Sequence, residues 1–233
     1  MSKVYACSDL HGMYSLFEQI KNFIQPGDIV YCLGDCGDRG PSGWRIISEV
    51  MDNPQWKYLK GNHEDMLAKA IKSNHRDFCF SEEQDLLYYN GGRLTYEAWE
   101  KETQWDESWA KRLHELPYYA KYYNTSNQMI LLSHSGCIHP DQYVPERDCL
   151  WDRSHMGITT WPLRDDVYIV HGHTPVALAR KGRTHPELLK IENYCDGHKF
   201  NIDLASWYTG VCCLLDLDTF EEHYFYTTPI ERN

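Results

Sequence analysis

Apolar residues along the chain fall into short runs that alternate between strand-like and helix-like spacing. The run from Lys3 to Ser8 predicts a buried strand, and Leu16, Ile20 and Phe23 recur at helical spacing over about 13–24. Two more strands are predicted at 29–33 and 56–59, with helices near 44–51 and from residue 64 onward. Strands that alternate with helices predict a mainly parallel, helix-flanked sheet and therefore an α/β fold.

The pattern changes between about Ser73 and Tyr123, where Gln, Glu, Trp and Tyr dominate and the segments resemble short helices. About 50 residues without strands form a weak core by themselves. We therefore expect a helical insertion, about 73–123, within a single domain of residues 1–233. Because both ends must return to the sheet, we expect the insertion to pack over one side of the functional site that the polar segments described below predict. In that position it would shape which substrate the site accepts.

Strand-like runs return after Gln128. They lie at 129–133, 167–170, 199–204, 211–217 and 222–226. The last three are close together with turns between them, which predicts antiparallel strands. The sequence thus favours mixed β-sheets flanked by helices.

Composition and charge exclude several classes of protein. With 42% apolar residues and no stretch near the roughly 20 apolar residues that cross a bilayer, the chain has no expected membrane partner. A formal net charge of −11 disfavours unassisted binding to nucleic acid. The nine cysteines form no CxxC pair and lie mostly in or beside apolar runs, which is typical of free thiols in a reducing compartment. We expect a soluble cytoplasmic protein, with its oligomeric state open.

Polar, metal-capable residues follow five of the predicted strands at the point where each strand ends. The five segments are Ser8-Asp9-Leu10-His11-Gly12, Gly34-Asp35-Cys36-Gly37-Asp38-Arg39-Gly40, Gly61-Asn62-His63-Glu64, Ser133-His134 and His171-Gly172-His173-Thr174. One such segment alone is more often a turn or a helix cap. In an open α/β sheet, however, ligands bind at the carboxyl ends of strands, so five segments in order indicate a functional site.

This ordered set resembles the motifs GDxHG, GDxxDRG, GNHE, a strand-terminal His and GHT of the phosphoprotein phosphatases, within the calcineurin-like metallophosphoesterases. The compact bacterial and phage, lambda-phosphatase-like type is the most similar. The resemblance covers nearly the whole chain and is weakest in the insertion. It implies the calcineurin-like metallophosphoesterase fold. One position departs from the pattern: Ser8 stands where the first motif has Gly, which removes no ligand.

The resemblance implies a site for two divalent transition metal ions. Asp9 and His11 would bind the first ion and Asp35 would bridge both, while Asn62, His134 and His173 would complete the second site. Mixed carboxylate, amide and imidazole ligands favour Mn, Fe or Zn over Mg or Ca, and we expect manganese first. A shared carboxylate suits two cations about 3.5 Å apart, with a bridging hydroxide that attacks phosphorus in line.

The resemblance also assigns catalytic and phosphate-binding residues. His63 would protonate the leaving oxygen, with Asp38 holding its imidazole. Arg39 and Arg153 would bind phosphate oxygens, Arg39 with the planar fork that lysine lacks. Lys60 stands where many relatives carry arginine, and its point charge could still attract phosphate.

The function expected from these residues is that of a phosphoric monoester hydrolase. The substrate would be a phosphoprotein or a phosphorylated small molecule, and the activity that of a serine/threonine protein phosphatase, with dual specificity toward phosphotyrosine left open. Two alternatives stay open at this point. One is a dinucleoside polyphosphate hydrolase acting on diadenosine tetraphosphate, since that branch shares the ligand set. The other is a non-catalytic metal-binding scaffold, which would not need His63, Asp38 and Arg39.

Overall fold

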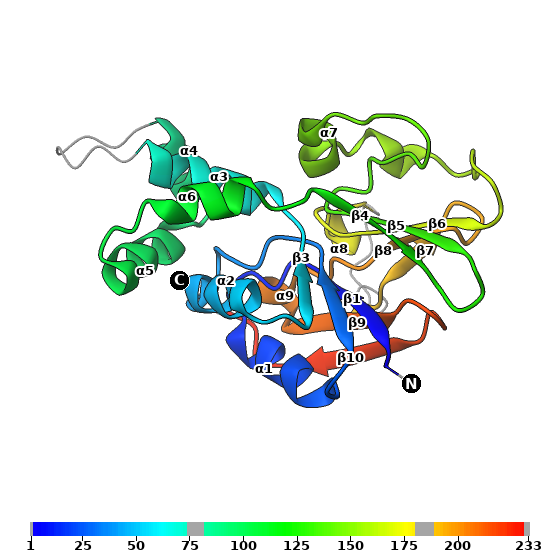
Figure 1. Cartoon of the computed structure of the whole chain (residues 1–233), viewed down its shortest axis with the longest axis horizontal. Helices are drawn as coiled ribbons and strands as arrows, with labels where there is room; N and C mark the ends of the chain where they lie inside the picture. Colours follow the sequence, from blue (N-terminus) through cyan, green and yellow to red (C-terminus); the bar gives the residue numbers. More distant parts are fainter. Residues whose placement is uncertain (1, 74–81, 180–188, 231–233) are drawn as a thin grey trace.

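The computed structural model describes residues 2–73, 82–179 and 189–230. The stretch 74–81 of the predicted insertion lies outside the described residues. Two five-stranded sheets form the centre of the molecule, and helices flank them (Figure 1). The prediction of an α/β fold with mixed, helix-flanked sheets is confirmed.

The first sheet has the order β10-β9-β1-β2-β3. Its strands are β1 (Val4–Cys7), β2 (Ile29–Cys32), β3 (Trp56–Tyr58), β9 (Val211–Asp216) and β10 (Glu222–Tyr226). Strands β1, β2 and β3 are parallel, so their carboxyl ends meet at one edge. Strand β9 is antiparallel to both β1 and β10, as the sequence predicts for the C-terminal pair.

The second sheet has the order β4-β5-β6-β8-β7. Its strands are β4 (Tyr119–Tyr123), β5 (Met129–Ser133), β6 (Val167–His171), β7 (Glu192–Tyr194) and β8 (Lys199–Asn201). The prediction that β8 joins β9 and β10 in an antiparallel group is wrong, because β8 pairs parallel with β6. The chain turns through a left-handed Ala205 and the short α9 (Ser206–Thr209) before β9, and so crosses between the sheets.

The expected insertion is helical only over part of its length. Helices α4 (Glu82–Tyr89), α5 (Arg93–Thr103) and α6 (Ser108–His114) occupy its middle. Its last five residues, Tyr119–Tyr123, instead form edge strand β4, antiparallel to β5. Tyrosine favours strands, and the alternating exposure along β4 is that of a half-buried strand.

Two apolar layers hold the sheets in place. Between the sheets, Ala6 of β1 packs with Leu132 of β5 and Val170 of β6. On the outer face of the first sheet, Tyr5 and Cys7 pack with three helices, α1 (Tyr14–Phe23), α2 (Gly43–Asp52) and α3 (Asn62–Lys72). Successive side chains of a strand face opposite ways, so both faces of β1 are buried.

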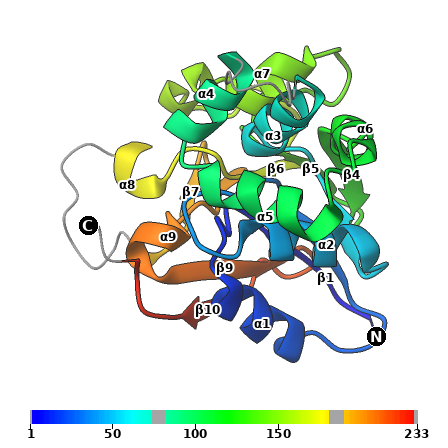
Figure 2. The same ribbon diagram turned by 90° about the vertical axis from the view of Figure 1, so that its left-hand side faces the viewer.

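The insertion extends the outer layer. Fully buried Trp99 belongs to the same apolar cluster as α2 and α3, and Figure 2 shows α5 alongside α2. The remaining short helices are α7 (Glu146–Trp151), a 3₁₀ helix (Ser154–Gly157) and α8 (Val176–Ala179). In the described part of the chain, no helix combines the length and apolar character needed to cross a bilayer.

Candidate functional site

The six side chains predicted as metal ligands come together where the two sheets meet. The loops after β1 and β2 supply Asp9, His11 and Asp35, and Asn62 is the first residue of α3, which follows β3. His134 comes directly after β5, and His173 lies two residues after β6. All six are at most 6% exposed. Burial of so many polar groups costs free energy unless each group has a polar partner. The contacts among these side chains therefore describe the site.

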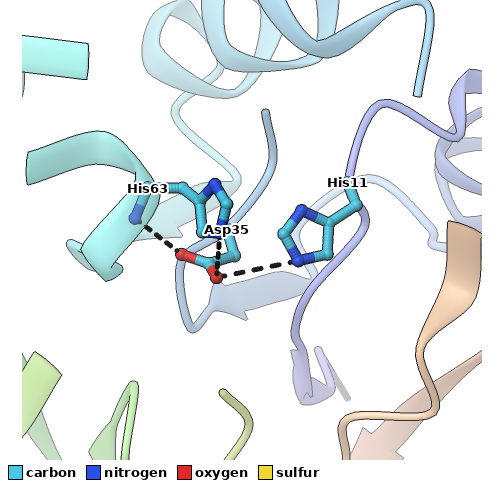
Figure 3. Close-up of side chains that lie close together, drawn as sticks. All are labelled: His11, Asp35 and His63. Carbon is cyan, nitrogen blue, oxygen red and sulfur yellow. Dashed lines mark hydrogen bonds and ion pairs between the residues drawn. The ribbon is translucent and has the colours of Figure 1, made fainter. Parts of the chain in front are cut away.

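Figure 3 shows the Asp35 carboxylate between the rings of His11 and His63. Its Oδ2 lies 3.7 Å from Nε2 of His11, 3.4 Å from Nε2 of His134 and 3.7 Å from Nε2 of His63. Its Oδ1 accepts a hydrogen bond from the main-chain N–H of His63 at 3.1 Å. Oδ1 of Asp9 lies 3.9 Å from Nε2 of His11. One carboxylate therefore faces both halves of the predicted ligand set.

The ligands predicted for the second ion, Asn62, His134 and His173, lie closer together than those predicted for the first. Oδ1 of Asn62 lies 2.9 Å from Nε2 of His134 and 2.9 Å from Nδ1 of His173, and these two nitrogens are 3.1 Å apart. Nδ1 of His134 lies 2.7 Å from the Leu33 carbonyl, and Nδ1 of His11 lies 2.9 Å from that of Gly37. In the neutral ring, donation from Nδ1 leaves the lone pair on Nε2.

Strained backbone brings these side chains close together. Left-handed φ angles occur at Asp9 (54°), His11 (41°), Asp35 (55°) and His173 (68°), a region that costs most residues energy and is frequent at functional sites. Glycine provides the clearance at Gly172, where an added Cβ would lie 2.0 Å from Oδ2 of Asp9. The site is thus shaped by its loops as much as by its side chains.

Two residues without an assigned role orient the ligand set. Oδ2 of Asp9 accepts hydrogen bonds from the Ser8 hydroxyl at 2.5 Å and from the N–H of His173 at 3.0 Å. Fully buried Glu64 accepts from the N–H groups of Asp35 (2.8 Å) and Gly61 (2.9 Å). Glu64 occupies the third position of α3, where a Glu that reaches back to the cap residue is a recognisable sequence signal. Ser8 offers no comparable signal.

The donor set fits two cations. Lone pairs of imidazole nitrogens and carboxylate or amide oxygens converge on Asp35 and Asn62, and such groups repel one another unless positive charge lies between them. Nδ1 of His173 faces Oδ1 of Asn62 and Nε2 of His134, so Nδ1 is the atom that could ligate a cation, with the proton of the neutral ring on Nε2. The ligand role of each residue stays a prediction, and the identity of the metal is open.

Metal binding is expected to strengthen as the pH rises. Burial opposes the charged form of His134, but the carboxylates of Asp35 and Asp9 outweigh burial and raise the pKa of His134 to about 10. A cation at Nε2 must displace that proton, so below this pKa each unit of increase in pH should raise the apparent affinity about tenfold. Titration of the metal-free protein with Mn²⁺ at pH values of about 7 and 8 measures this. A pH-independent affinity would show that no proton has to leave His134 when the metal binds.

His63 and Asp38 form a buried pair beside the ligand set. Nδ1 of His63 donates to Oδ2 of Asp38 at 2.6 Å, which leaves Nε2 directed toward Asp35 and 3.3 Å from Nη2 of Arg39. Burial lowers the pKa of His63, but Asp35 and Asp38 outweigh burial and raise it above its ordinary value. The Arg39 guanidinium also lies over the ring of Trp207, with 5.3 Å to the centroid. The pair can therefore supply a proton close to a bound anion.

The other cations predicted near phosphate differ in position. Exposed Arg153 lies beside the GHT segment, where its Nε donates to Oγ1 of Thr174 at 3.0 Å. Buried Lys60 instead donates to Glu146 at 2.6 Å and to the carbonyl of His114 at 2.5 Å. The expectation that Lys60 attracts phosphate is not supported, because its ammonium ties α6 to α7. Sequence alone could not reveal partners 54 and 86 residues away.

Comparison with known sequences gives one family. The sequence model described as "Calcineurin-like phosphoesterase" matches residues 2–208. No curated protein sequence matches the chain significantly.

Several solved structures share the fold. A protein inferred to be a diadenosine tetraphosphatase has a TM-score of 0.63 at 15% identity, over 97% of this chain and 93% of that one. A protein serine/threonine phosphatase from Saccharomyces cerevisiae gives 0.59 at 12%, over 100% and 81%. A cold-active protein-tyrosine phosphatase of a psychrophilic Shewanella species gives 0.54 at 16%, over 94% and 76%. The TM-scores establish a shared fold, and sequence identities this low leave the substrate open.

Proposed function

The chain belongs to the calcineurin-like phosphoesterase family, and on that premise we propose that it is a metal-dependent phosphomonoesterase of the phosphoprotein phosphatase type. The family implies a hydrolase with a phosphate-ester substrate. The finer proposal is hydrolysis of phosphoserine and phosphothreonine in proteins, with phosphotyrosine as a further substrate to be tested.

Each group of residues has a separate role in this proposal. Asp9, His11, Asp35, Asn62, His134 and His173 would hold two divalent cations. When bound, such cations supply positive charge to the phosphoryl oxygens and lower the pKa of water. Arg39 and Arg153 would orient the phosphate, since a guanidinium can donate two parallel hydrogen bonds to its oxygens. The buried loops exclude bulk water from the six predicted ligands, which strengthens electrostatic interactions there.

The observation that carries the monoesterase proposal is the His63–Asp38 pair at 2.6 Å. An alkoxide such as the serine oxygen is a poor leaving group and needs a proton during bond cleavage. A nucleotide that leaves through a phosphate oxygen is a much better leaving group than an alkoxide, because the phosphate is far more acidic than the alcohol. It therefore needs little help from a general acid. An imidazole that is held at Nδ1 and directs Nε2 into the site therefore favours a phosphate monoester over a dinucleoside polyphosphate.

A comparison of three substrates tests this proposal. We expect the purified protein, supplied with Mn²⁺, to hydrolyse a phosphoserine peptide with a higher kcat/KM than diadenosine tetraphosphate. A phosphotyrosine peptide measures dual specificity in the same assay. Preference for diadenosine tetraphosphate would replace the proposal by the polyphosphate hydrolase. Bound metal without hydrolysis of any of these substrates, or of an aryl phosphate, would point to a scaffold.

A further inference from the structure

We propose that Thr95 of the insertion is a positioning residue, which holds the main chain of Asp38 and through it the orientation of His63. This inference rests on the proposed function, because it concerns the delivery of a proton to the leaving group. It gives the insertion a specific role, since the turn after α4 and the first turn of α5 hold the GDCGDRG loop.

Two hydrogen bonds connect the insertion to this loop. The N–H of Asp38 donates to Oγ1 of Thr95 at 2.8 Å, and the N–H of Arg39 donates to the carbonyl of Gly91 at 2.9 Å. Thr95 is 1% exposed and 57 residues away in sequence from Asp38. Both bonds are long-range contacts, and the bond between Asp38 and Thr95 is buried.

Both braced residues have a strained backbone. Asp38 and Arg39 have left-handed φ angles of 67° and 61°, which residues with a Cβ adopt only when their surroundings hold them there. Each has its main-chain N–H bonded to the insertion. A buried N–H that loses its acceptor is destabilising, so removal of the Thr95 hydroxyl should let the main chain at Asp38 relax, while Arg39 keeps its own bond to Gly91.

Packing leaves little freedom for other arrangements. A Cβ added at Gly43 would lie 2.3 Å from Oγ1 of Thr95, and one at Gly92 would lie 2.9 Å from Oδ1 of Asp38. The N-cap residue of α5, Gly92, thus lies against the same carboxylate whose Oδ2 binds His63. Movement of the α4–α5 turn would move the Asp38 carboxylate, and the His63 ring with it.

The consequence concerns the leaving group rather than substrate binding. Among the described residues Thr95 has no hydrogen bond to His63 or to a predicted ligand, and its hydroxyl accepts from the N–H of Asp38, so we expect its effect to pass through Asp38. A misdirected imidazole should slow release of an alkoxide and should matter little for an activated phenolate. The structure therefore predicts a selective loss of kcat.

Three variants test the brace. Thr95→Val keeps the shape and removes the acceptor, and we expect kcat on a phosphoserine peptide to fall about tenfold, with less than about a threefold loss on p-nitrophenyl phosphate. Both KM values should change little. Thr95→Ser keeps the hydroxyl, and its kcat on both substrates should stay close to that of the native protein. Thr103→Val is the matched control, since Thr103 lies in the same helix and bonds only to Trp99 and Asp106 in the described contacts.

The outcomes separate this inference from the proposed function. Equal slowing of Thr95→Val on both substrates, no slowing, or failure of Thr95→Ser to restore activity would overturn the brace while leaving the phosphatase intact. Hydrogen exchange of the Asp38 amide tests the brace without any activity. We expect Thr95→Val to speed that exchange by about tenfold or more and Thr103→Val to leave it unchanged. Unchanged exchange in Thr95→Val would overturn the brace, even in a chain that hydrolyses no phosphate ester.

Discussion

Replacement of Asp35 by Asn is expected to weaken both metal sites and to lower kcat/KM by about a thousandfold or more. Its Oδ2 faces the nitrogens of His11, His134 and His63 within 3.7 Å, so one substitution removes charge from both halves of the ligand set. The amide oxygen can still accept from the His63 N–H, which should preserve the fold. Metal content by elemental analysis, activity with added Mn²⁺ and thermal melting measure the effect.

Asp28→Asn is the matched control for Asp35→Asn. Asp28 is also buried, and its carboxylate accepts from the N–H groups of Lys3 and Gln25 at 2.8 Å, with no contact to the predicted ligands among the described residues. This variant should melt at a lower temperature and keep its metal. If Asp35→Asn retained full metal content and activity, Asp35 would not be the shared ligand.

His63→Asn is expected to lose most activity on a phosphoserine peptide, by ~10²–10⁴ in kcat, and much less on an activated aryl phosphate. The reason is geometric: Nδ1 of His63 is held by Asp38, and Nε2 is directed toward the centre of the site. Because the His63 ring is not among the six predicted ligands, both metals should stay bound. Rates on both substrates, with metal content, are the measurements.

Asp38→Asn should show the same dependence on the leaving group in a milder form, because the imidazole remains but loses its anionic partner.

The close approach of His63 to His11 and Asp35 also allows a different role for His63, since these three side chains could hold one cation. Loss of metal from His63→Asn, or equal slowing on both substrates, would show that His63 is a ligand or a substrate-orienting residue and not the general acid.

The sequence predicts the site's position well because a simple rule applies to it. Carboxyl ends of parallel strands gather at one edge, and glycine-flanked Asp, Asn and His at five such ends are visible in the sequence itself. The structure places Asp9 and Asp35 after strands of the first sheet and His134 and His173 at strands of the second. The division into two sheets leaves no trace in the local pattern, because a buried strand has the same pattern in either sheet.

Residues that act through distant contacts cannot be identified from the sequence. Thr95 is an ordinary helix residue until its hydroxyl meets the N–H of Asp38, and Lys60 looks like a phosphate ligand until its contact with Glu146 is seen. The predicted pairing of strand β8 is wrong for the same reason, since its partner β6 lies about 30 residues back along the chain. Pairings of this kind depend on tertiary packing, which overrides local preference.

We propose that the buried Asp, Asn and His cluster holds two metal ions on which phosphate-ester hydrolysis depends. Elemental analysis of the purified protein, combined with aryl phosphate hydrolysis before and after chelation, tests it most directly. We expect about two transition metal ions per chain, loss of activity when they are removed and recovery on addition of Mn²⁺. An active protein without transition metal, or activity that survives complete chelation, would contradict the claim.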